Sequence, residues 1–132
     1  MSNQPITEQT LNAAGIRLAD SRQLYPALHR ADDAGLPMLV VDNALGHAVI
    51  ALQGAHLMAY KAAGEREMLW LSPKTVLAAG TPIRGGIPLC LPWFGPGPDG
   101  KAMHGFARTM NWTVVGAEQL DCGATRLVLG LD

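Results

Sequence analysis

Residues 36–62, LPMLVVDNALGHAVIALQGAHLMAYKA, contain the strongest indication of the fold. The first run, LPMLVVDN, is apolar between Pro37 and the pair Asp42-Asn43, and both its length and its boundaries are typical of a strand. The remainder holds two more strand-like runs that meet at Gly54. A glycine between two such runs favours a bulge or a tight bend. The stretch therefore predicts short, consecutive β-strands.

Similar patterns continue toward the C-terminus. EMLWLSP (67–73) is a short apolar run that a Ser-Pro pair stops, and NWTVVGAEQ (111–119) and ATRLVLGLD (124–132) flank turn-forming residues. Short strands at regular spacing with little helix are typical of antiparallel sandwiches and barrels. We therefore predict an all-β fold built as an antiparallel β-sandwich.

The first 35 residues have a different composition. They are rich in alanine and leucine with polar residues between, which predicts one or two short helices that end at Gly35. We accordingly divide the chain into an N-terminal segment, 1–35, and a β-rich part, 36–132.

Composition excludes several classes of protein. The chain has 132 residues, 48% of them apolar, and a net charge of −1, so it is globular and has no basic field for nucleic acid or an anionic membrane. No apolar run approaches the roughly 18 residues that a membrane helix needs. The polar start, MSNQPITEQT, lacks the features of a secretory signal, and we expect a cytoplasmic protein. Cys90 and Cys122 are expected to be reduced, buried thiols, and no metal-ligand spacing surrounds them.

Two apparent phosphate motifs are excluded on physical grounds. GPGPDGK (95–101) satisfies the letters of two glycine-rich patterns that aim backbone N–H groups at phosphate. Pro96 and Pro98 remove two of those donors, and Ala102 follows where a serine or threonine would bind magnesium. We predict an exposed loop. His29, His47 and His56 have no clustered ligands and are expected to be ordinary surface or core histidines.

The motifs that carry chemistry are IRGG (83–86), PLCLPWFG (88–95) and HGFARTMNW (104–112), in that order after LQGAHLMAYKAAGEREMLWLSP (52–73). From about Leu36 to the last residue, this succession resembles the glucose-6-phosphate 1-epimerase family, the hexose-6-phosphate mutarotases of the aldose 1-epimerase group. The resemblance implies a β-sandwich of the galactose-mutarotase type. It also implies that a hexose 6-phosphate is the substrate and that no metal or cofactor takes part.

The same resemblance implies which residues bind substrate. Arg84, His104 and Arg108 would line the site, and Gln53 would have a supporting role. The residue types suit this chemistry, because planar guanidinium groups hold a phosphate dianion through paired hydrogen bonds and an imidazole can bond a sugar hydroxyl. Gly85 and Gly86 would let the backbone turn close to the sugar, while Pro88 and Pro92 stiffen the segment that follows. Trp93 and Phe94 would either anchor this frame or form a wall of the cleft.

The resemblance covers only the N-terminal part of the family. Family members open the sugar ring with a histidine from an H-T-Y-F-like motif and a glutamate near the C-terminus, and neither motif occurs in this sequence. No catalytic residue is therefore assigned within these 132 residues. We expect the chain alone to be inactive or nearly so, and to self-associate through open strand edges.

Two other functions remain open. In the first, Arg84, His104 and Arg108 form a module that binds a sugar or phosphate without catalysis. In the second, the chain is a β-rich interaction domain and its arginines are ordinary surface charges.

Overall fold

The computed structural model describes residues 6–30 and 34–132. Its main element is an antiparallel sheet with the order β1 (Ile16–Asp20), β2 (Pro37–Asn43), β3 (Gly46–Ala51) and β4 (His56–Ala62). The local sequence explains both turns that connect the consecutive strands β2, β3 and β4. The Asn43 side-chain oxygen accepts hydrogen bonds from the backbone N–H groups of Leu45, at 2.8 Å, and Gly46, at 3.1 Å, which closes the β2–β3 turn.

The β3–β4 connection turns at Gly54, where φ is +81°. This left-handed conformation suits glycine, and the predicted bend is confirmed. A bulge also occurs, but it lies earlier in β3, between Val49 and Ile50.

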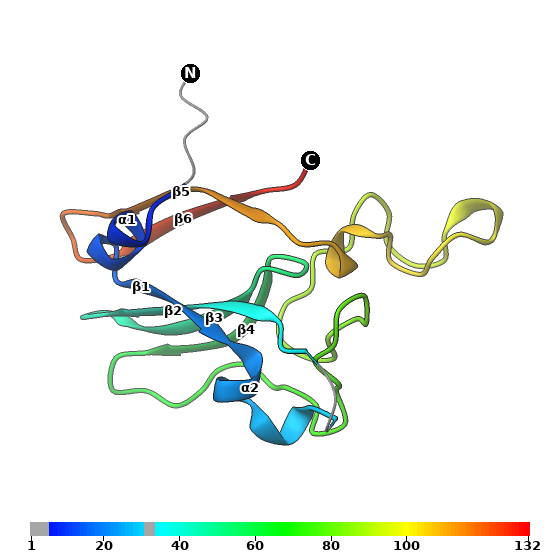
Figure 1. The fold of residues 1–132 in the computed structure, drawn as a ribbon, viewed down its shortest axis with the longest axis horizontal. Coiled ribbons are helices and arrows are strands. Elements are labelled where there is room, and N and C mark those ends of the chain that lie inside the picture. Colours follow the sequence, from blue (N-terminus) through cyan, green and yellow to red (C-terminus); the bar gives the residue numbers. More distant parts are fainter. Residues whose placement is uncertain (1–5, 31–33) are drawn as a thin grey trace.

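A second layer covers one face of the sheet. It consists of the hairpin β5 (Thr113–Gln119) and β6 (Thr125–Gly130), together with helix α1 (Glu8–Ala13) (Figure 1). Leu39, Val41 and Ile50 of the sheet form a buried cluster with Leu11 of α1, and Leu127 of β6 packs against it. The two layers form the sandwich that the short, regularly spaced strands predicted.

The opposite face of the sheet carries the other half of the core. Helix α2 (Ser21–Leu24), the 3-10 turn η1 (Pro26–Leu28) and the irregular chain that follows β4 lie against it (Figure 1). Met38 of β2, Met58 of β4 and Leu77 of the irregular chain are each at most 1% exposed in this cluster. Both faces of the central strands are therefore buried, which explains why LPMLVV is a continuous apolar run instead of an alternating one.

Residues 63–112 contain no ladder of strands within the described chain. They form the 3-10 turns η2 (Pro98–Gly100) and η3 (Ala107–Thr109), and single β-bridges tie them to the sheet and to one another. The bridged pairs are Gln53 with Asn111, Leu57 with Ile87, Leu71 with Gly85, and Leu91 with Gly105. In Figure 1 the yellow part of this segment, around residue 100, projects from one end of the molecule.

The prediction of a strand at 67–73 was wrong. Only Leu71 makes a β-bridge there, while the Glu67 carboxylate accepts hydrogen bonds from the backbone N–H groups of Tyr60 and Leu69, both at 2.9 Å. The Met68 N–H also donates to the Tyr60 carbonyl at 2.9 Å, so one side chain and one backbone bond tie this segment to β4 in place of a ladder. Met68 and Trp70 point outward, 71% and 68% exposed.

The N-terminal segment also differs from its prediction. The two short helices are present, but β1 lies between them and pairs with β2 along five residues. A strand this short is stabilised by pairing with residues 37–41, a long-range contact that local patterns do not reveal. The prediction of buried thiols was likewise wrong, because Cys90 is half-buried and Cys122 is exposed. No helix in the described ranges is long and apolar enough to cross a membrane.

Candidate substrate-binding site

The RGG turn presents an arginine from a fixed backbone. The backbone N–H of Arg84 donates to the Thr75 hydroxyl at 2.9 Å, and its carbonyl accepts from the N–H of Ser72 at 3.0 Å, while its side chain is exposed. Gly85 has φ of +114° and packs so closely on the chain at 70–71 that a Cβ would lie 2.5 Å from the Trp70 carbonyl oxygen. Glycine is therefore required at this position by both conformation and space.

His56 supports this turn from inside the protein. It is 1% exposed, and its Nε2 lies 2.6 Å from the Gly85 carbonyl oxygen, so Nε2 carries the proton and donates. Burial lowers the pKa of His56 below its ordinary value of 6.5; the bond to Gly85 opposes this shift and the positive charge of Arg108 adds to it. His56 is therefore a neutral structural link between β4 and the RGG turn.

Gln53 supports the chain just before the turn. It is 2% exposed; its amide nitrogen donates to the Thr81 carbonyl at 3.0 Å, and its amide oxygen accepts from the Gly80 N–H at 2.9 Å. Both polar ends are satisfied by backbone. This arrangement suits the supporting role expected of Gln53, and it leaves the side chain no open face toward a ligand.

His104 and Arg108 lie together in the HGFAR segment. The Arg108 Nη2 donates to the carbonyl of Met103, the residue before His104, at 3.0 Å. Its Nε is buried and has no hydrogen-bond partner within the described chain. The backbone of Arg108 packs against Gly54, where a Cβ would lie 2.6 Å from the Arg108 carbonyl oxygen. The LQG and HGFAR segments therefore pack so closely that a side chain at position 54 would overlap the backbone of Arg108.

Two hydrogen bonds to Gly95 hold His104, one through its backbone and one through its ring. It has φ of +61°, its N–H donates to the Gly95 carbonyl at 2.7 Å, and its Nδ1 accepts from the Gly95 N–H at 2.9 Å. The following Gly105 crosses the Leu91 backbone so closely that a side chain would overlap it. These contacts join HGFAR to PLCLPWFG.

The two aromatic residues of PLCLPWFG have different environments. The indole N–H of Trp93 donates to the Ala102 carbonyl at 2.8 Å, and its ring meets Phe106 edge-on at 6.0 Å between centroids. Trp93 therefore anchors the loop. Phe94 is 80% exposed, and its ring centroid lies 4.7 Å from that of His104.

Two hydrogen bonds anchor the motif segments. The Gly85 carbonyl, next to Arg84, accepts from His56, and the Arg108 guanidinium donates to the carbonyl of the residue before His104. The positive charge of Arg108 also lowers the pKa of His56. Sequence reasoning treated His56 as an ordinary histidine and missed this link. Its location in the LQGAHL segment, beside Gln53, is the one signal that could have pointed to it.

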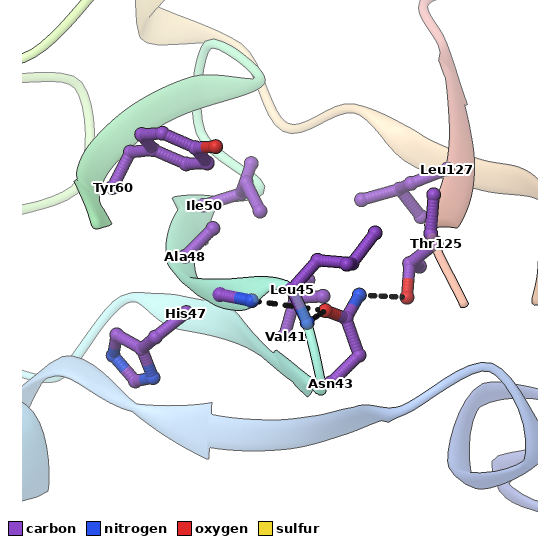
Figure 2. A pocket seen from close by; sticks show the side chains of 11 residues that line it. Val41, Asn43, Leu45, His47, Ala48, Ile50, Tyr60, Thr125 and Leu127 are labelled. Carbon is purple, nitrogen blue, oxygen red and sulfur yellow. Dashed lines mark hydrogen bonds between the residues drawn. The ribbon is translucent and has the colours of Figure 1, made fainter. Parts of the chain in front are cut away.

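A separate groove lies away from these motifs. Its volume is about 320 Å³, and it lies between the β2–β3 turn, β4 and the β5–β6 hairpin. Figure 2 shows Leu45, Ile50 and Leu127 facing this space, with the Asn43 amide bonded to the Thr125 hydroxyl at 2.9 Å. None of the four candidate residues lines it. The described chain also contains no cluster of three or more histidine, cysteine or acidic residues that could hold a metal ion.

Comparisons with known proteins agree with the motifs. The aldose 1-epimerase family profile matches residues 37–132. A protein of Escherichia coli strain K12, provisionally named glucose-6-phosphate 1-epimerase, is 50% identical over 93 residues, which cover 70% of this chain and 32% of the relative. A Salmonella typhimurium protein with the same provisional name is 45% identical over 102 residues, covering 76% and 35%.

Solved structures give the same result. The crystal structure of a Salmonella typhimurium protein, provisionally described as a mutarotase, superposes with a TM-score of 0.62 at 45% identity, and covers 70% of this chain and 31% of that one. The chain thus spans about a third of the length of these relatives. The fold is that of the galactose-mutarotase type, as predicted. On the match over residues 37–132, which include all the motif segments, this chain belongs to the aldose 1-epimerase family.

Proposed function

We propose that this chain contributes the substrate-binding part of an enzyme that interconverts the α and β anomers of a hexose 6-phosphate. The observation that carries the proposal is the name of the relatives, glucose-6-phosphate 1-epimerase, at 45–50% identity over 93 and 102 residues of this chain. The two arginines in IRGG and HGFAR favour a phosphorylated sugar. Each guanidinium can donate two parallel hydrogen bonds to one phosphate.

Arg84 and Arg108 are assigned to the phosphate and His104 to the sugar. The fixed backbone of Arg84 supports this role, because a pre-positioned donor loses less entropy on binding. The buried, unpartnered Nε of Arg108 supports it as well, since a ligand oxygen or a water would satisfy that donor.

The reaction itself needs two proton-transfer groups. A base removes the proton of the anomeric hydroxyl while an acid protonates the ring oxygen; the ring opens, the C1–C2 bond rotates, and reclosure gives the other anomer. We assign both groups to sequence beyond these 132 residues. The chain alone then binds substrate without turning it over.

The test is two-dimensional exchange NMR of glucose 6-phosphate, with the chain alone and with a version extended through the downstream reading frame. We expect the extended version to speed exchange and the short chain to bind without doing so. Arg84→Ala should weaken binding at least tenfold, a loss of about 1.4 kcal/mol. Arg17→Ala, an exposed arginine on β1, should leave binding unchanged.

Two results would contradict this proposal. If the extended version neither binds glucose 6-phosphate nor speeds exchange, the assigned activity is wrong. If the short chain alone speeds exchange, and Arg84→Ala lowers that rate, the acid and base lie within residues 1–132.

A further inference from the structure

The hydrogen bonds of His104 determine where its ring proton lies. Nδ1 accepts from the Gly95 N–H at 2.9 Å, so Nδ1 must present a lone pair. In a neutral imidazole the single ring proton then lies on Nε2. A reciprocal backbone bond, from the His104 N–H to the Gly95 carbonyl at 2.7 Å, holds the two residues together, and turning the ring over would break the bond between the Gly95 N–H and Nδ1.

The Nε2–H group of His104 is therefore an available donor. Within residues 6–30 and 34–132, no carbonyl or side chain accepts a hydrogen bond from it, and the side chain is half-buried, not enclosed. In this state Nε2 can give a hydrogen bond to an oxygen, but it cannot accept a proton from a sugar hydroxyl. His104 acts as an oriented donor.

Phe94 lies directly beside this donor. Its ring is tilted 46° from the His104 ring, at 4.7 Å between centroids, and no other large apolar residue of the described chain has so high an exposed fraction, 80%. The neighbouring Trp93 is anchored by its bond to Ala102, which keeps Phe94 at the surface. A ligand that covers a large exposed aromatic ring removes its apolar area from water, which favours binding.

The combination fits one class of ligand. A pyranose ring has an apolar face of C–H groups and a rim of hydroxyl oxygens, so it can lie on an aromatic face while one oxygen accepts a hydrogen bond. Phosphate has no such face. The Arg108 guanidinium, which donates to the Met103 carbonyl next to His104, places a cationic donor in the same segment as the aromatic face and the neutral donor.

We propose that Phe94 is a specificity residue that binds the C–H face of the sugar ring, while Gly95 holds His104 as the Nε2–H tautomer that donates to an oxygen of the same sugar. The proposal rests on the proposed function and adds the part of the site that distinguishes a phosphosugar from phosphate alone. It assigns Gly95 as the positioning residue of His104.

The experiment compares two ligands across matched variants. Glucose 6-phosphate and inorganic phosphate are titrated by calorimetry into the wild type, Phe94→Ala, Phe94→Tyr and Met68→Ala, the last being an exposed apolar residue outside the motifs. We expect Phe94→Ala to weaken glucose 6-phosphate binding roughly tenfold and phosphate binding less than twofold. Phe94→Tyr, which keeps the ring, should restore affinity, and Met68→Ala should leave both affinities unchanged.

A second measurement addresses the histidine directly. A long-range ¹H–¹⁵N spectrum of the ring nitrogens should show His104 as the Nε2–H tautomer, both free and with glucose 6-phosphate. An Nδ1–H tautomer in either state would overturn the assigned donor.

The outcomes separate this inference from the function on which it rests. If the wild type binds neither ligand, the proposed function fails and the sugar contact fails with it. If the wild type binds glucose 6-phosphate and Phe94→Ala binds it equally well, or loses both ligands to the same extent, only the sugar contact is overturned.

Discussion

Single residues decide how closely the motif segments approach one another. Gly105 has φ of +72°, and a Cβ at this position would overlap the Leu91 carbonyl. Gly64 has nearly the same conformation, φ of +77°, but a Cβ there would have nothing within 4 Å. Substitutions at these two glycines therefore separate the free-energy cost of the left-handed conformation from the cost of the close approach to Leu91.

We expect Gly64→Ala to lower the free energy of unfolding by about 1 kcal/mol, the cost of a left-handed backbone for alanine. Gly105→Ala should cost at least about 2 kcal/mol more, because the Leu91 backbone must move. Urea unfolding of both variants measures this difference. Equal losses would show that the contact between HGFAR and Leu91 contributes nothing beyond conformation.

His56 makes stability depend on pH. Its folded-state pKa lies below 6.5, so the unfolded chain takes up a proton more readily than the folded protein. The contribution is fully present above pH 6.5 and is lost as the pH falls from 6.5 through the lower folded pKa. Burial is the main cause, with the charge of Arg108 in the same direction and the bond to Gly85 opposing.

The measurement is the free energy of unfolding of the wild type and of His56→Gln from about pH 7.5 to about pH 5. We expect the wild type to lose more stability than the variant across this range, because glutamine can donate to Gly85 but does not titrate. Other ionisable groups act equally in both proteins. Parallel curves would contradict the neutral, buried state of His56.

Among the elements, the β5–β6 hairpin is attached to the sheet by a small polar clamp. The Thr125 hydroxyl donates to the Ala14 carbonyl at 2.7 Å. It also accepts from the Asn43 amide at 2.9 Å (Figure 2). The clamp joins three elements, because Ala14 directly follows α1 as its C-cap, Asn43 ends β2 and Thr125 begins β6. Apolar packing of Leu127 and Leu129 supplies the rest of the contact.

Thr125→Val keeps the shape of the side chain and removes both bonds. We expect the variant to lose about 1–3 kcal/mol, because the Ala14 carbonyl and the Asn43 amide are left half-buried without this partner. Hydrogen exchange of the hairpin amides should accelerate. Thr113→Val, an exposed threonine at the start of β5, is the control and should change stability by less than about 0.5 kcal/mol.

In the molecule as a whole, strand edges remain open. β1 ends the four-stranded sheet, and no strand of the described chain pairs with its outer edge. Leu18 of this strand is 56% exposed. An apolar edge strand is a template for pairing with a second copy, as the sequence led us to expect.

We expect the sedimentation coefficient of the wild type to rise with protein concentration. Leu18→Lys should reduce this rise, because a charge on an edge strand opposes pairing. Leu45→Lys, 50% exposed in the β2–β3 turn, adds the same charge away from an edge and should have little effect. A wild type that stays monomeric, or equal effects of the two substitutions, would contradict association through β1.

Prediction from sequence succeeded where the signal was local. The runs at 36–43, 111–119 and 124–132 contain β2, β5 and β6, and the bend lies at Gly54 as expected. It failed at EMLWLSP, where an apolar run is tied to β4 by the Glu67 carboxylate, and at Ile16–Asp20, whose strand exists through pairing with β2. In both cases the deciding contact joins the run to a strand elsewhere in the sequence, β4 through Tyr60 in the first case and β2 in the second.

The candidate site shows the same division. The family, the order of the motifs and the residue types that suit a phosphosugar could all be read from the sequence, because glycine, arginine and histidine in those positions are properties of the chain. The folded arrangement was needed to show that His56 links β4 to the RGG turn, that the Gln53 side chain bonds the backbone, and that Trp93 anchors its loop while Phe94 stays exposed. Burial and hydrogen-bond partners depend on which distant segments meet, and a pattern along one chain does not contain that information.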